Sequence, residues 1–145
     1  MIRLVVVSAV LAIGATAVFA QSDPIAQRKA TMKGVGDATR AGNQMVKGET
    51  PFDLAKAKDV LQTYAKAADT MHTYFPENSK TGGDTAALPT VWEKQAEFRK
   101  RFDDWSVDIK KASAQTKDLD SFKDAFGTVT KACGGCHETF RMKKS

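Results

Sequence analysis

The chain contains 145 residues, of which 42% are hydrophobic and 27% are charged, and its formal net charge is +5 at pH 7. This length is sufficient for one domain with a substantial hydrophobic core. The positive charge is spread along the whole chain without a block of lysine and arginine, which argues against a nucleic acid as the partner.

The N-terminal segment predicts a secretory signal peptide. A single cation, Arg3, precedes a short apolar run that ends in small side chains at Ala20. The run is shorter than a membrane span of about 20 apolar residues, and the polar residue Gln21 follows it directly. We therefore expect residues 1–20 to be removed during export to the periplasm. Residues 21–145 would then form one domain without a membrane anchor.

In the rest of the chain, apolar side chains recur at steps of three and four, which is typical of amphipathic helices. The first predicted helix starts at Pro24 and closes at Gly48. We expect Thr50 to cap the second helix, Pro51 to occupy its first position and Pro76 to stop it. The inward-facing stripe of the first helix consists of Ile25, Arg28, Met32, Val35, Thr39 and Gly42.

A polar, glycine-rich segment at residues 77–89 separates the second predicted helix from the third, and its length suggests a functional role. The third helix is expected to start near Thr90 and the fourth to follow Asp118 as its cap. Trp92 and Trp105 are expected to be core anchors. Four amphipathic helices with mostly short links predict an all-α fold, an antiparallel up-down-up-down four-helix bundle.

The densest group of reactive side chains lies in the fourth predicted helix, where Cys133, Cys136 and His137 belong to the sequence CGGCH. A disulfide there would close a very small ring inside a helix, with little entropic benefit. A redox-active dithiol requires a helix N-terminus after a strand. A zinc site would need a fourth ligand, for which the chain offers only His72 or a carboxylate.

Covalent haem attachment explains this spacing best. On a helix the two thiols and the imidazole lie at i, i+3 and i+4 and share one face. The sulfurs can then bond the two vinyl groups of one porphyrin edge while the imidazole reaches the iron. Gly134 and Gly135 would leave the ring room to approach the backbone. We predict one haem c in the core near the C-terminal helix, bound through Cys133 and Cys136, with His137 as an iron ligand.

With this motif so close to its C-terminus, the chain resembles the class II c-type cytochromes, the cytochrome c′ family and its low-spin relatives. The resemblance covers nearly all of residues 21–145. It rests on QRKATMK at 27–33, KGETPFD at 47–53, FPENSKTGGDTAALPTVW at 75–92 and CGGCHETFRMKKS at 133–145. The family's four-helix bundle agrees with the helices predicted above, and the resemblance leaves a homodimer open.

The resemblance implies that Arg28 and Thr85 contact the haem propionates. A cation on a core-facing stripe is costly unless it is paired, and a propionate would pair Arg28. Alternatively, Arg28 extends to solvent or pairs with a carboxylate of the protein. Some members of the family have glutamine at the position of Lys29. Because this chain has a lysine there instead, the resemblance does not extend to a haem contact of Lys29.

The second axial position of the iron decides between two functions. In the family, the residue at the position of Met32 either ligates the iron or crowds a vacant site. In the predicted bundle Met32 lies at the height of His137, whereas Met45 is roughly 20 Å further along the first helix. Met142 shares the helix of His137, and Met71 and His72 belong to a helix that the family places away from this face. We therefore expect Met32 to be the second ligand.

Residues arranged for hydrolysis or acyl transfer are absent from the sequence, so we do not expect an enzyme. The expected function is that of a periplasmic monohaem c-type cytochrome in electron transfer, with His137 and Met32 on the iron and periplasmic redox proteins as partners. The alternative is a high-spin, five-coordinate protein that binds nitric oxide or carbon monoxide.

Overall fold

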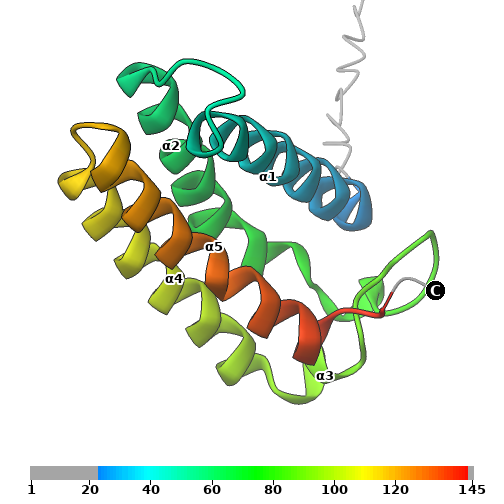
Figure 1. Cartoon of the computed structure of the whole chain (residues 1–145). Coiled ribbons are helices and arrows are strands. Elements are labelled where there is room, and N and C mark those ends of the chain that lie inside the picture. The colour runs from blue at the N-terminus through cyan, green and yellow to red at the C-terminus, as the bar shows by residue number, and fades with distance from the viewer. Residues whose placement is uncertain (1–22, 144–145) are drawn as a thin grey trace, which may run out of the picture.

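The computed structural model describes residues 23–143, and four long helices form most of it. The predicted signal peptide, residues 1–20, lies outside the described residues. These helices are α1 (Pro24–Val46), α2 (Leu54–Thr70), α4 (Gln95–Gln115) and α5 (Leu119–Phe140). The shorter elements η1 (Met71–Tyr74), η2 (Glu77–Ser79) and α3 (Thr90–Glu93) connect α2 to α4. Consecutive long helices run in opposite directions (Figure 1), so the predicted all-α up-down-up-down bundle is confirmed.

The start of α2 differs from the prediction. Its N-cap is Asp53 and not Thr50, because the Asp53 carboxylate accepts hydrogen bonds from the backbone N–H groups of Ala55 at 2.9 Å and Lys56 at 3.1 Å. A carboxylate that satisfies two free N–H groups is a strong cap. Thr50 and Pro51 therefore belong to the link between α1 and α2.

The third predicted helix is divided into α3 and α4. Lys94 leaves the helical region, with φ −123° and ψ 46°, and α4 starts immediately after it. Within α3, the indole N–H of Trp92 donates to the carbonyl oxygen of Phe75 at 3.0 Å. This bond fixes α3 against the segment that follows α2.

The core is built from the predicted helical stripes. Trp92 and Trp105 are buried, as expected of core anchors, whereas Leu54 at the start of α2 is exposed. The main contacts between long helices join α4 to α2 and α5, and α1 to α2 and α5. Of these four contacts, that between α1 and α5 is the least extensive. The largest fully buried side chains are Tyr64, Phe122, Leu61, Ile109, Val91 and Val129.

The connecting loop, residues 75–89, folds back onto the C-terminal end of α5 (Figure 1). The backbone N–H of Leu88 donates to the carbonyl oxygen of Phe140 at 3.0 Å, and that of Met142 donates to Ala86 at 2.8 Å. These bonds hold the loop beside the helix that carries the CGGCH sequence.

Candidate haem site

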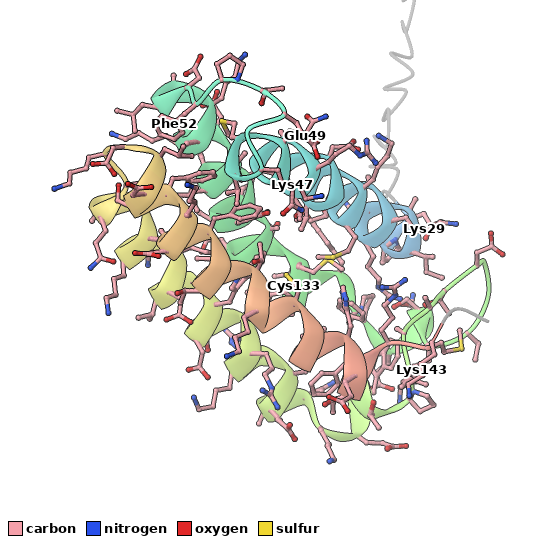
Figure 2. The ribbon with its side chains drawn as sticks, in the orientation of Figure 1. Lys29, Lys47, Glu49, Phe52, Cys133 and Lys143 are labelled. Atoms are coloured by element: carbon pink, nitrogen blue, oxygen red, sulfur yellow. The ribbon has the colours of Figure 1, made fainter. Side chains whose placement is uncertain are left out.

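A cavity of about 880 Å³ opens beside the contact between α1 and α5, at the end of the bundle that the connecting loop covers. This volume lies within the usual range of ligand pockets, about 300–1,000 Å³. All the residues predicted to contact haem line it. They are Cys133, Cys136 and His137 from α5, Arg28 and Met32 from α1, and Thr85 from the connecting loop. Figure 2 shows Cys133 on the side of α5 that faces α1.

Both cysteines are half-buried and are not joined to each other. Burial raises the pKa of the Cys133 thiol. Burial also raises the pKa of Cys136, against the lowering effect of the Arg101 cation. A raised pKa keeps these groups as neutral thiols at neutral pH, which is unlike a redox-active dithiol. The structure thus supports neither the disulfide nor the dithiol alternative.

His137 offers a neutral imidazole to the cavity. Burial lowers its pKa, and the nearby Arg141 cation lowers it further. A neutral imidazole keeps a free lone pair, which metal ligation requires. Within residues 23–143, no three His, Cys, Asp or Glu side chains converge as a metal site, so the zinc alternative is not supported.

Gly134 and Gly135 do not have the role that the sequence suggested. Both are exposed, and neither lines the cavity. A Cβ added to Gly134 would meet nothing within 4 Å, and one added to Gly135 would reach only the Arg101 side chain at 4.0 Å. The two glycines therefore lie on the outer side of α5, and ring clearance does not explain them.

Arg28 is almost fully buried, with 5% of its surface exposed, and it does not extend to solvent. Within residues 23–143, no carboxylate forms an ion pair with it either. Its Nε–H donates to the carbonyl oxygen of Tyr74 at 2.5 Å, and its other donors face Ser79 and Thr85. Burial lowers the pKa of this guanidinium, while Asp23 raises it. In this structure the donors of Arg28 therefore bond oxygens of the protein, and the guanidinium neither extends to solvent nor forms an ion pair with a described carboxylate.

Thr85 lines the cavity from the connecting loop. Its Oγ1 accepts hydrogen bonds from Arg28 Nη1 and from the backbone N–H of Ala87, both at 3.3 Å. Among the described residues no acceptor faces its hydroxyl hydrogen, so this hydrogen can be donated to a carboxylate in the cavity.

Met32 is half-buried and lines the cavity from α1. Met45, Met142 and His72 do not line the cavity. This agrees with the sequence-based expectation that none of them is the second iron ligand. Met71 does line the cavity, although it was expected on a helix that lies away from this face. It is the first residue of the 3-10 turn η1, which follows α2.

Two thiols and a neutral imidazole on one helix, a thioether on another and polar groups at the mouth form a donor set that fits haem c. The family model described as "Cytochrome C'" matches residues 23–141. This chain belongs to the cytochrome c′ family. As a member of that family it binds haem c covalently and is a haem electron carrier.

Several known proteins are similar to this cytochrome. A cytochrome c′ from Rhodopseudomonas palustris is 40% identical over 144 residues, which is 99% of each chain. A cytochrome c-556 from the same organism is 31% identical over 148 residues, again 99% of each chain. The solved structure of cytochrome c′ from R. palustris superposes with a TM-score of 0.82 at 43% identity, covering 86% of this chain and 100% of that one.

Proposed function

We propose that this cytochrome is a periplasmic one-electron carrier, in which Cys133 and Cys136 hold one haem c through thioethers and His137 and Met32 ligate its iron. The haem supplies the ferric/ferrous couple. The observation that carries the proposal is that Met32 on α1 and His137 on α5 line the same cavity.

The cysteines have the protonation state that thioether formation needs. Burial holds both as neutral thiols. When a thiol adds across a vinyl group, its S–H bond breaks and one S–C and one C–H bond form, so the addition exchanges no electrons with a third partner. Cys133 and Cys136 are one helical turn apart on α5, which suits two neighbouring vinyl groups.

His137 and Met32 would be complementary ligands for the haem iron. The imidazole is neutral because burial lowers its pKa. The thioether of Met32 is soft and never charged, and therefore suits both oxidation states of iron. If both side chains hold the iron, a small molecule would have to displace one of them to bind, which would favour electron transfer over gas binding.

The same cavity can serve a second function. If Met32 only packs above the iron, the protein is a five-coordinate cytochrome that takes up nitric oxide or carbon monoxide. The apolar surroundings of Met32 favour this alternative, because Val35, Phe75 and Phe102 line the cavity and offer no competing ligand.

We also propose that residues 1–20 are a signal peptide and that the protein works in the periplasm with redox proteins as partners. The lengths of the matches support this. The sequence of the R. palustris cytochrome c′ aligns with 99% of this chain. The solved structure of cytochrome c′ from the same species aligns over its whole length, but with only 86% of this chain. Removal of an N-terminal segment produces such a difference. Within the described residues, no helix is both long and apolar enough to cross a bilayer.

Carbon monoxide uptake by the ferrous protein tests the proposed ligation. Native protein should react slowly, and Met32→Leu should react at least about tenfold faster, equivalent to ~1.4 kcal/mol in the barrier. Met71→Leu is the matched control, because Met71 lines the same cavity, and it should behave like the native protein. Native protein that reacts as fast as Met32→Leu would favour the gas-binding function, and acceleration by Met71→Leu alone would make Met71 the ligand.

A further inference from the structure

A second, smaller cavity of about 190 Å³ lies beside the haem cavity, between η1 and the start of α4. We call it the His72 cavity. A water molecule needs only about 15 Å³, so this cavity has room for a small ion. Its lining consists of His72, Phe75, Val91, Gln95, Phe98 and Arg99. Phe75, Val91 and Phe98 also line the haem cavity and therefore form a wall that the two cavities share.

His72 has a buried nitrogen without a partner. Its Nδ1 is shielded from solvent, and among residues 23–143 no group forms a hydrogen bond with it. The ring packs beside Phe102, with 6.3 Å between the two ring centroids. An unsatisfied buried nitrogen is costly, which points to a partner from outside the chain. Since Nδ1 of an imidazole can carry a hydrogen, that partner can be a hydrogen-bond acceptor.

Arg99 brings a positive charge to the same cavity. Its side chain is exposed, and it forms no hydrogen bond or ion pair with the described residues. The next cation on α4, Lys100, is paired with Asp104 at 2.7 Å. Of the described residues, no aspartate or glutamate lines the His72 cavity. The charge of Arg99 is thus uncompensated there, which favours an anion.

The backbone adds a positive potential at the same place. Gln95 lines the cavity and begins α4, and no side chain of the described residues caps this end of the helix. Free N–H groups at the start of a helix attract an anion. Glu97 is the acidic residue of this turn, and its carboxylate is already paired with Arg101 at 3.3 Å. A cation, an unpartnered imidazole nitrogen and a free helix N-terminus therefore meet at one cavity.

We propose that the His72 cavity binds a small oxyanion of the phosphate type through the Arg99 guanidinium and the His72 imidazole. The planar fork of an arginine matches two oxygens of such an anion. The shared wall brings the anion close to the haem cavity. A negative charge there stabilises ferric haem over ferrous haem, which carries one positive charge less, so the bound anion lowers the midpoint potential. Only this effect on the potential rests on the proposed electron transfer.

Nitrogen NMR of the His72 ring in the haem-loaded protein tests anion binding directly. The chain has only two histidines, so with His137 on the iron the free imidazole signal belongs to His72. The protein is kept ferrous under carbon monoxide, which makes it diamagnetic whichever residue is the native sixth ligand. Inorganic phosphate is titrated at constant pH and ionic strength, with chloride as the balancing anion. The Nδ1 resonance should shift to a saturating value.

Arg99→Gln should weaken phosphate binding by at least about tenfold, because the contact with two oxygens is lost. Lys110→Gln is the charge-matched control, since Lys110 is another exposed cation of α4 that does not line the cavity, and it should bind as the native protein does. In redox titrations, phosphate should lower the midpoint potential of the native protein and of Lys110→Gln. His72→Phe keeps a ring beside Phe102 and should lose this phosphate dependence, as should Arg99→Gln.

The proposal is overturned if phosphate leaves the His72 resonances unchanged or shifts them without saturation, because the cavity then holds water only. It is also overturned if Arg99→Gln binds phosphate as tightly as the native protein. If His72→Phe does not fold, Arg99→Gln still decides, since its side chain is exposed. A native protein that proves five-coordinate would refute the Met32 ligation alone, because the NMR titration does not depend on it.

Discussion

Gly42 on α1 lies directly against the ring of Phe126 on α5. A Cβ added to Gly42 would stand within 3.0 Å of three carbons of that ring. Both residues are buried, so the contact holds two helices at a separation that a larger side chain would not permit. Since α1 and α5 also carry the residues on both sides of the haem, this contact fixes one end of the site.

Gly42→Ala is expected to destabilise the protein despite the better helix propensity of alanine. Overpacking of this kind costs about 1–3 kcal/mol, whereas replacing a helical glycine gains about 1 kcal/mol. Urea denaturation measures the net effect. Gly34→Ala, also on α1, is the matched control, because its Cβ would meet nothing within 4 Å, and it should stabilise. Equal stability of the two variants would mean that the helices can separate without cost.

A buried tyrosine predicts how the fold responds to alkali. The Tyr64 hydroxyl is 2.7 Å from Thr39 Oγ1, and Thr39 donates its own hydrogen to the carbonyl oxygen of Val35, so Tyr64 is the donor of the pair. Burial raises the pKa of Tyr64 to about 12, from an ordinary value of 10.0. The fold thus favours the neutral phenol, which contributes stability below pH 10 that is lost as the pH rises toward 12.

Tyr64→Phe should therefore remove part of the decline in unfolding free energy between pH 10 and about 12. The full contribution corresponds to roughly 2.7 kcal/mol for two pK units. At neutral pH the variant should lose about 1 kcal/mol through the missing hydrogen bond. Denaturant titrations at several alkaline pH values measure both effects. Tyr74→Phe should keep the native decline, and the same decline in Tyr64→Phe would show that other groups cause it.

Mass spectrometry of the denatured, exported protein tests the covalent attachment and the signal peptide together. The expected mass is that of residues 21–145 plus one haem, because the two thiols line one cavity wall. Cys133→Ala and Cys136→Ala should each keep haem through one thioether, and the double variant should release it on denaturation. A native chain without added mass, from cells with working haem-attachment machinery, would refute attachment.

The helices and the shared face of Cys133, Cys136 and His137 could be predicted from the sequence because both depend on local spacing, whereas Arg28 and Thr85 were implied only by the family resemblance. Apolar periodicity gives the helices, and the i, i+3, i+4 spacing of Cys133, Cys136 and His137 places them on one face. In an antiparallel bundle, the position of Met32 along the first helix places it at the same height as His137 on the last helix. The Thr50 cap was wrong because Asp53 also follows the breaker Pro51, and the spacing of apolar residues does not choose between two good caps.

The partners of Arg28 could not be predicted, because they are mostly main-chain atoms of an irregular segment. The carbonyl oxygens of Tyr74 and Ser79 point at the guanidinium only through the course of η1 and η2. The break at Lys94 was missed for a similar reason. No helix breaker in the sequence marks the end of α3. The break coincides with the hydrogen bond from the Trp92 indole N–H to the carbonyl oxygen of Phe75, which holds α3 in place.

The absorption spectrum of the purified, oxidised native protein tests the central claim most directly. If His137 and Met32 both ligate the iron, the spectrum should be low-spin, with a weak sulfur-to-iron band in the far red that Met32→Leu abolishes and Met71→Leu retains. A native spectrum that is already high-spin and lacks this band would contradict the proposed electron carrier and support the gas-binding function.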